Sequence, residues 1–301
     1  MRIECKDLSY VYGKGTPFEK NALDNINITI EEEKITGLIG HTGSGKSTLA
    51  LLICGLLRPT SGSIFIGGKE TYRAEREDNK KRRGAKRANR KSSEKMKFKA
   101  GIIFQYPEYQ LFEETVYKDI AYGPTNMGLS KEEIDRKVRD AAEFAGIPEN
   151  LFGASPFELS GGQRRRAAIA GIIAMDPPIL ILDEPAAGLD PRGRAEILGG
   201  LYEYQKITKK TMIMISHSME DMAKYAEKVH VLKDAKSYLY GTIEEIFSKV
   251  DYLKNSGLDV PQITGLFLEL EKRGLKVDRG VYNIEKARDE IVRLLGGDIK
   301  C

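Results

Sequence analysis

A short stretch combines glycines, a lysine and hydroxyl side chains at a spacing that suits phosphate binding. Its residues are Gly40, His41, Thr42, Gly43, Ser44, Gly45, Lys46, Ser47 and Thr48. The stretch follows the apolar residues 35–39 and opens a helical pattern, which is the strand, loop and helix order of a P-loop. We therefore expect polyphosphate to bind there, with Lys46 on the β- and γ-phosphates and Ser47 on Mg²⁺. A glycine-rich turn without a ligand is the alternative.

Two carboxylates close another apolar strand pattern farther along the chain. Asp183 and Glu184 directly follow residues 179–182. An aspartate at the end of a strand near a P-loop is suited to the Mg²⁺ shell, and the next glutamate can orient or deprotonate an attacking water. His217 lies just beyond the strand pattern 211–215, where it either joins the phosphate site or has a structural role. These residues predict nucleotide chemistry without separating a GTPase, a kinase and a transport motor.

Aromatic side chains point to two further sites. Tyr12 ends the strand pattern of residues 2–12 and offers a flat ring for stacking on adenine, with a core or surface role as the alternative. The segment from Gln105 to Phe112 is rich in aromatic residues and follows the short strand pattern 100–104. We expect this segment to be either a docking surface or a small satellite of the core.

Length and composition define the class of protein. The chain has 301 residues, of which 41% are hydrophobic and 31% charged, as in a globular protein with one large α/β domain and a smaller unit. No apolar run reaches the length of a membrane span, and the first residues lack an apolar signal region. The three cysteines form no paired framework, so we expect a cytoplasmic protein.

The net charge of +4 is unevenly distributed. Residues 69–99 hold 14 Lys and Arg against 5 Asp and Glu, a charge of +9, whereas the rest of the chain carries −5. This basic insertion, about residues 70–97, has three interpretations: a solvated loop, a membrane-surface patch or a nucleic-acid arm. It lacks interleaved aromatic residues, which favours the solvated loop.

Periodicity predicts the elements that position these groups. Residues 2–12 have the pattern of an edge strand, and Ile26 to Ile30 that of a half-buried antiparallel strand. Residues 179–185, whose apolar run 179–182 ends in the two carboxylates, and residues 211–215 have the pattern of buried parallel strands. The remaining expected strands are 63–66, 100–104, 229–232 and 237–241, and the expected helices are 115–127, 131–145, 167–175, 261–273 and 284–295.

The motifs in their order resemble those of ATP-binding-cassette (ABC) ATPases. Leu159-Ser160-Gly161-Gly162-Gln163 is similar to the family signature and lies between the P-loop and the carboxylate pair. Gln105 matches the Q-loop, Gly188-Leu189-Asp190 the D-loop and His217 the switch histidine, so the resemblance covers about residues 1–245.

A narrower resemblance is to the ATPase subunits of energy-coupling factor (ECF) transporters, and within them to the second ATPase type, often called EcfA-prime. Phe104 to Thr115, Ser155 to Leu159 and Gly257 to Pro261 carry it. The basic insertion is longer and more basic than this family leads us to expect, so no family role is transferred to it.

The resemblance implies a P-loop ABC nucleotide-binding domain over residues 1–245, with a RecA-like parallel core, an antiparallel β subdomain and an α-helical subdomain. Residues 246–301 would be a small, mostly helical C-terminal unit that holds a dimer together. Glu184 would be the base, Gln105 would sense the metal and the nucleophile, Asp183 would hold Mg²⁺, and His217 would contact the γ-phosphate of ATP. Ser160, Gly161, Gly162, Gln163 and Asp190 would complete the nucleotide site of a second, related ATPase subunit in a head-to-tail dimer.

In this family the dimer drives a membrane coupling protein, which works with a substrate-binding membrane subunit to import a vitamin or a transition-metal ion. The resemblance thus implies a peripheral protein on the cytoplasmic face of the membrane, with the aromatic loop as its coupling surface and no nucleic acid as a partner. The ATPase of a conventional importer or exporter is the first alternative. A nucleic-acid-associated ATPase is the second.

Overall fold

The structure is a computed structural model that describes residues 1–73 and 99–295. Its centre is a mixed sheet of order β10-β9-β3-β8-β7-β6 among the described residues. Neighbours from β9 to β6 run parallel, and β10 pairs antiparallel with β9. The strands are β3 (Ile35–Ile39), β6 (Ala100–Ile103), β7 (Ile179–Asp183), β8 (Thr211–Ile215), β9 (Lys228–Lys233) and β10 (Lys236–Thr242). The parallel strands predicted from apolar runs are therefore confirmed.

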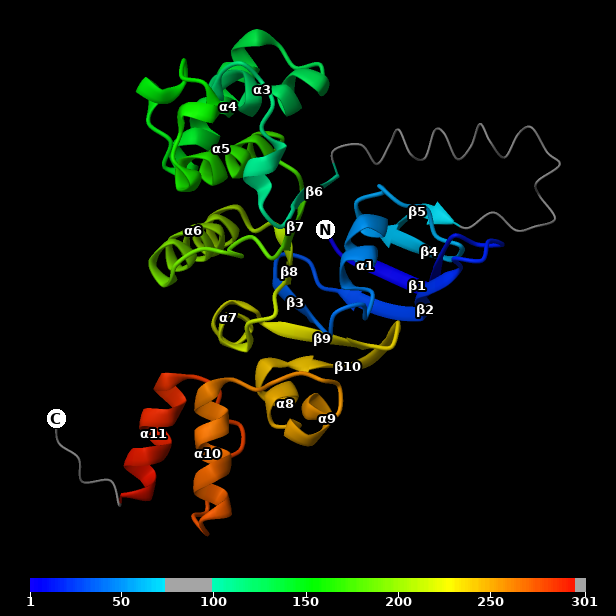
Figure 1. Cartoon of the computed structure of the whole chain (residues 1–301), viewed down its shortest axis with the longest axis vertical. Coiled ribbons are helices and arrows are strands. Elements are labelled where there is room, and N and C mark those ends of the chain that lie inside the picture. Colours follow the sequence, from blue (N-terminus) through cyan, green and yellow to red (C-terminus); the bar gives the residue numbers. More distant parts are fainter. Residues whose placement is uncertain (74–98, 296–301) are drawn as a thin grey trace.

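Alternate side chains of each parallel strand enter two different cores. Ile181 and Ile213 pack toward α1 (Lys46–Ile53), whereas Leu182 and Met214 pack toward α6 (Pro191–Thr208) and α7 (Met219–Tyr225). Figure 1 shows α6 and α7 on one side of the sheet and α1 on the other. Because both faces are covered, the strands are apolar throughout, and only their ends carry polar groups.

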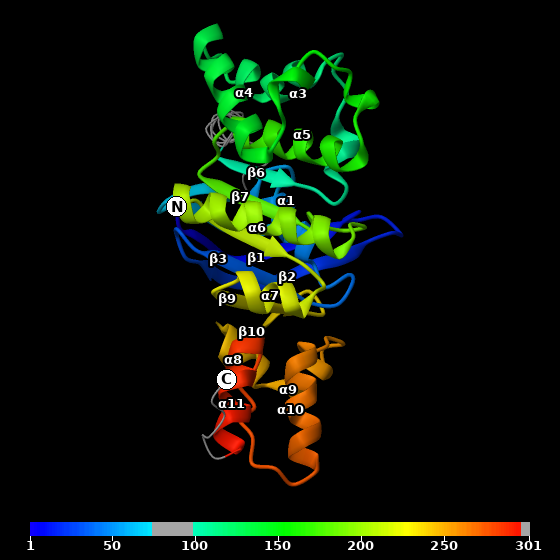
Figure 2. The same cartoon turned by 90° about the vertical axis from the view of Figure 1, so that its left-hand side faces the viewer.

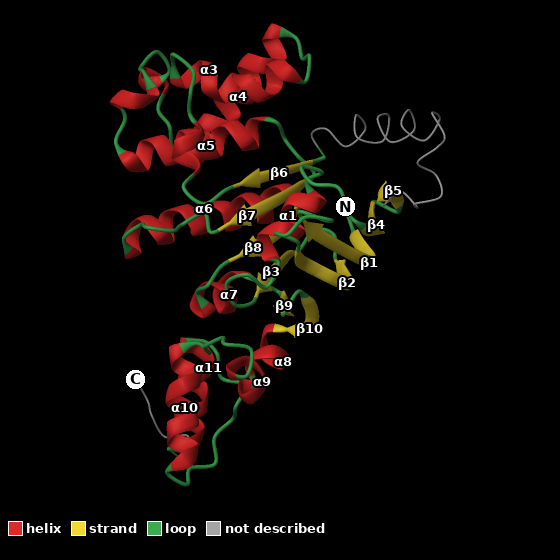
Figure 3. Cartoon of the chain, turned by 45° about the vertical axis from the view of Figure 1, so that its right-hand side comes forward, coloured by secondary structure: helices red, strands yellow, loops and turns green. Residues whose placement is uncertain are grey.

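A second, antiparallel sheet covers α1. Its strands are β1 (Ile3–Tyr12), β2 (Lys20–Ile30), β4 (Ser61–Ile66) and β5 (Lys69–Arg73), in the order β2-β1-β4-β5. The expectation that residues 2–12 form an edge strand is wrong, because β1 pairs with β2 on one side and with β4 on the other. Figure 3 shows the strands of both sheets around α1. Residues 70–73, expected in the basic insertion, lie in β5, and residues 74–98 lie outside the described part of the chain.

A helical unit follows β6 and returns to β7. It consists of η2 (Pro107–Gln110), α3 (Val116–Asn126), α4 (Lys131–Ala145), η3 (Glu149–Leu151), η4 (Pro156–Glu158) and α5 (Gly161–Ala174). Capping boxes start α4 at Ser130 and α5 at Ser160, so local sequence determines where both helices begin. The described chain thus has the predicted ABC architecture, with a parallel core, an antiparallel subdomain and a helical subdomain.

The last described residues form a separate helical group. Its helices are α8 (Ile243–Phe247), α9 (Val250–Lys254), α10 (Gln262–Lys272) and α11 (Ile284–Leu294). Phe267, Val281 and Ala287 form a small core of their own there. Figure 2 shows the helical unit, the sheets and this C-terminal group in succession along the long axis. No helix of residues 1–73 and 99–295 has the length and apolar character needed to cross a bilayer.

Candidate nucleotide site

The loop between β3 and α1 has the conformation that its glycines were expected to permit. Gly45 has a φ of 104° and caps α1, and a Cβ atom there would lie 2.5 Å from the carbonyl oxygen of Ala22. Only glycine avoids both the left-handed strain and this close approach. Lys46 is buried behind the loop, where its Nζ donates to the carbonyl oxygens of Gly40 at 2.7 Å and His41 at 3.0 Å. Burial lowers the pKa of Lys46, and the charges of Glu184 and Asp183 oppose that effect.

The carboxylates at the end of β7 lie beside this loop. Burial raises the pKa of Asp183, while a hydrogen bond from Ser47 and the charge of Lys46 oppose the rise. Ser47 and Asp183 are thus oxygen groups in mutual contact. Mg²⁺ in nucleotide sites takes oxygen ligands from one or two side chains and the rest from phosphates and water. The described residues hold no cluster of three or more His, Cys, Asp or Glu side chains suited to a metal.

Glu184 has a strained backbone and a buried carboxylate. Its φ is 53°, and its N–H donates to the carbonyl oxygen of Ile215 at 3.1 Å, which ties the end of β7 to the end of β8. Burial and, to a smaller extent, Asp183 raise the pKa of Glu184 to about 6, against the effect of the His217 backbone N–H. Within the described chain, no hydrogen-bond donor reaches its Oε1. A carboxylate with a raised pKa and a free oxygen is suited to accept a proton.

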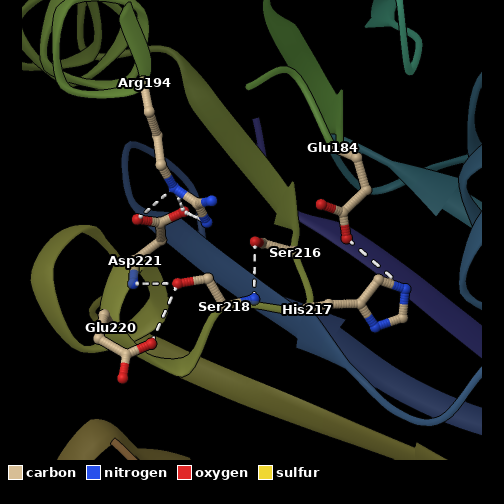
Figure 4. Close-up of polar contacts among 7 residues, drawn as sticks. All are labelled: Glu184, Arg194, Ser216, His217, Ser218, Glu220 and Asp221. Carbon is tan, nitrogen blue, oxygen red and sulfur yellow. Dashed lines mark hydrogen bonds and ion pairs between the residues drawn. The ribbon is translucent and has the colours of Figure 1, made fainter. Parts of the chain in front are cut away.

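His217 reaches the same place from the end of β8. Its Nε2 lies 3.7 Å from Glu184 Oε1, which is an ion-pair distance when the ring is protonated. Figure 4 shows the two side chains pointing toward each other. Burial and the charge of Lys46 lower the pKa of His217, which favours the neutral ring. The loop that carries His217 is held by its neighbours: Ser218 caps α7, and Asp221 on α7 forms an ion pair with Arg194 on α6.

Tyr12 borders the mouth of the site. Its ring is exposed and packs edge-on against the ring of Tyr10, with 4.7 Å between the ring centroids. Its hydroxyl oxygen lies 3.3 Å from Thr48 Oγ1. An exposed ring fixed in this way presents a free face for a base to stack on. Its role in adenine binding stays a prediction.

One cavity of about 330 Å³ brings most of these side chains together. Its lining residues are Tyr12, Lys20, Ala22, Thr42, Gly43, Gly45, Lys46, Ser47, Thr48, Gln105, Asp183, Glu184, Ile215 and His217. The sequence analysis missed Lys20, Ala22 and Ile215. Lys20 pairs with Tyr12 in the register of β2 and β1, but the alternation visible in the sequence began only at Ile26. Gly40, His41 and Ser44 belong to the loop without lining the cavity.

The signature residues lie outside this cavity. Ser160 and Gln163 bond each other's backbone N–H in the capping box of α5, at 3.3 and 2.9 Å. Gly161 and Gly162 form the first turn of that helix, and none of the four lines the cavity. Asp190 likewise caps α6 through the N–H of Gly193, at 2.8 Å. Within one chain, these residues therefore do not meet the P-loop.

Comparison with known proteins shows the family to which the chain belongs. The model of the ABC transporter family matches residues 23–187. The energy-coupling factor transporter ATP-binding protein EcfA2 of Clostridium acetobutylicum is 50% identical over 98% of both chains, and that of Clostridioides difficile is 44% identical over the full length of both. CbiO1 of Clostridium perfringens, part of the transporter complex CbiONQ, superposes with a TM-score of 0.70 at 36% identity, covering 88% of this chain and 98% of that one. The ATP-binding cassette MJ0796, solved as a dimer with ADP and phosphate, superposes with a TM-score of 0.66 at 25% identity. The superposition covers 80% of this chain and 98% of that one.

The fold and the site thus define an ABC ATPase. Within that class, the chain belongs to the family of energy-coupling factor transporter ATP-binding proteins, of the EcfA2 type.

Proposed function

We propose that this chain is the ATP-hydrolysing subunit of an ECF importer and that each ATP is enclosed between its P-loop cavity and the signature residues of a second ATPase subunit. Lys46 and the loop N–H groups bind the β- and γ-phosphates, and Tyr12 stacks on adenine. Ser47, Asp183 and Gln105 would hold Mg²⁺, which neutralises charge on the phosphates.

The reaction is the attack of water on the γ-phosphorus, with cleavage of its bond to the ADP oxygen. Glu184 accepts the proton of the attacking water, because its oxygen is free and its pKa of about 6 leaves it ionised at neutral pH. His217 contacts the γ-phosphate from the end of β8 and lies near Glu184. The hydrogen bond from the Glu184 N–H to the carbonyl oxygen of Ile215 joins the ends of β7 and β8, so both groups are held beside the position of the attacking water.

One observation carries the shared site: the signature residues begin a helix at the surface and do not reach the P-loop cavity of their own chain. Gly161 is the first residue of α5 and is exposed, so the N–H groups of an open helix N-terminus face outward there. A Cβ atom on Gly161 would meet nothing within 4 Å, so the space above it is open to a group from outside the chain. A glycine at an exposed helix start permits the close approach of an outside group, which we take to be the γ-phosphate bound to the second subunit.

Three further features of the proposal come from the relatives and the surface. The second ATPase is a related chain, and the membrane partners are a coupling protein and a substrate-binding subunit that imports a vitamin or a transition-metal ion. The aromatic loop is the coupling surface, because Tyr109 and Phe112 are exposed on it. We infer that the chain works at the cytoplasmic face of the membrane. Extraction in mild detergent should retain a small substrate-binding membrane protein, whereas a conventional importer would require a soluble receptor instead.

A bulky residue at Gly161 tests the shared site. In the extracted complex, Gly161→Arg should keep the ATP affinity of this chain's own cavity within about twofold of the parental value. It should lower the rate of ATP hydrolysis at least roughly 100-fold, because the variant loses a contact to the transition state. Gly199→Arg is the matched control, because Gly199 also lies in a helix and a Cβ atom there also meets nothing within 4 Å. Equal activities of the two variants would refute the enclosed site.

A further inference from the structure

Arg165 is a buried cation in the first turns of α5, only 3% exposed. A cation near a helix N-terminus opposes the helix dipole, and its desolvation is costly, so its contacts must offset both effects. The guanidinium forms a two-point ion pair with Glu108, with Nε to Oε2 at 2.8 Å and Nη2 to Oε1 at 2.6 Å. Although burial opposes ionisation of Glu108, the hydrogen bonds from Arg165 hold its pKa below the ordinary value.

The same side chain also bonds to the turn that follows Glu184. Arg165 Nη1 donates to the carbonyl oxygen of Ala187 at 2.8 Å and lies 3.5 Å from that of Pro185. One planar group thus connects Glu108, in the aromatic loop of residues 105–112, with the turn of residues 184–188. Lysine, a point charge with three donors, does not reproduce such a fork.

A second contact joins the same two segments. Tyr106 has a φ of 56°, and its ring lies 5.7 Å from the Arg165 guanidinium. A Cβ atom on Gly188, whose φ is 74°, would lie 3.1 Å from Tyr106 Cε1, so the ring packs directly on this turn. Tyr106 directly follows Gln105, and Gly188 lies four residues after Glu184. The strained conformation of Tyr106 is the kind that persists only where the surroundings fix it.

We propose that Arg165 is a positioning residue for hydrolysis: it fixes the Glu184 turn to the aromatic loop, so that a displacement of the loop displaces the base. The exposed end of that loop carries Tyr109, which is 82% exposed, and Phe112. A membrane partner that docks there pulls on Glu108 and, through Arg165, on the carbonyl groups next to Glu184. This inference rests on the proposed function, since it assigns a role to the proposed base and docking loop.

The test is a double-mutant cycle of Arg165→Lys and Glu108→Gln in the complete complex. Each single variant should lower kcat at least tenfold with the KM for ATP within about twofold, because neither residue lines the nucleotide cavity. The kcat of the double variant should be no lower than that of the worse single variant, as expected for two residues that act as a unit. Arg139→Lys is the control, since Arg139 forms an exposed ion pair with Asp135 on α4. An unchanged kcat, or a loss that appears only in KM, would overturn the proposal.

Loss of one partner of a buried ion pair destabilises proteins, so a second variant separates misfolding from mispositioning. Arg165→Met combined with Glu108→Met leaves no unpaired charge and should keep the thermal midpoint of the parent within a few degrees, yet it should still show the tenfold loss in kcat. A folded double variant with parental kcat refutes the positioning role. Glu184→Gln in the same complex tests the base itself: if that variant is fully active, the proposed function fails instead.

Discussion

Substitution of Glu184 by glutamine should make the protein more stable and nearly inactive. The side chain is 18% exposed, and its pKa of about 6 lies some 1.5 units above the ordinary value of 4.5. At 1.36 kcal/mol per unit, the folded state carries a cost of about 2 kcal/mol when this carboxylate is ionised. Glutamine has the same shape without the charge, so the variant avoids that cost. Its thermal midpoint should rise by roughly 4 °C at pH 8.

The size of the effect depends on pH. Below about pH 4.5 the carboxyl group is protonated in both the folded and the unfolded chain, so parent and variant should be equally stable there. The advantage of the variant should grow as the pH rises from 4.5 to 6 and stay constant above that range. Thermal melts at pH 4 and pH 8 measure this difference. Glu203→Gln, on an exposed position of α6, is the control and should show no such trend.

The same variant should lose the proton acceptor of the reaction. General-base catalysis contributes about 10²- to 10⁴-fold, so kcat should fall by that factor, while ATP affinity stays near the parental value and the ATP-bound dimer accumulates. Steady-state phosphate release, ATP titration and size-exclusion chromatography measure the three quantities. A variant that hydrolyses ATP at the parental rate would refute the role of Glu184. A variant that is less stable than the parent at pH 8 would refute the account of its pKa.

Three other outcomes follow from the same structure. Lys46→Ala should raise the Kd for ATP about 10- to 100-fold, because a charge-assisted contact to phosphate is lost; isothermal titration measures it, and unaltered affinity would exclude this contact. The kcat of the parent should halve as the pH falls to about 6, where Glu184 becomes protonated; a pH–rate profile that is flat from 5 to 8 would contradict this. Phe267→Ala should lower the free energy of unfolding of the small C-terminal core by about 3–5 kcal/mol and leave ATP affinity unchanged. Protease should then cleave the helices after Pro261 faster than in the parent; cleavage at the parental rate would count against a separate core.

The sequence allowed a correct prediction of most of the fold, because the buried parallel strands are uniformly apolar. Residues 211–215 form β8 and residues 131–145 form α4 with the predicted bounds, whereas β7 (Ile179–Asp183) ends two residues before the end of the predicted strand 179–185. The central place of β1 was not predictable from its own pattern. Its half-buried face resembles that of an edge strand, and the pairing with β4 depends on partners 52 to 63 residues away, from Ser9 with Ser61 to Ile3 with Ile66.

Some residues of the candidate site were likewise predictable from the sequence, and others were not. Groups within the P-loop or at the ends of apolar strands were predictable, because parallel strands bring their carboxyl ends to one edge of a sheet. The contacts of Arg165 were not, since Glu108 lies 57 residues away and the accepting carbonyl groups of the turn after β7 carry no side-chain signal. The sequence contains Arg164, Arg165 and Arg166 directly after Gln163, near a helix N-terminus where cations oppose the helix dipole, but it does not identify their partners.

The residues that carry the two proposals lie about one turn apart on the same helix. Gly161, where the γ-phosphate of the second subunit is expected, and Arg165, which holds the aromatic loop, are four residues apart on α5, about 6 Å along the helix axis. A helix cannot shift one of these residues without the other, because its backbone hydrogen bonds join positions four apart. In the proposed complex, a displacement of α5 by the phosphate at Gly161 would carry the guanidinium of Arg165 with it, and through Arg165 both Glu108 and the turn after Glu184. Dimer closure over ATP and the position of the proposed docking loop would then be one motion, which is the coupling that a transport motor requires.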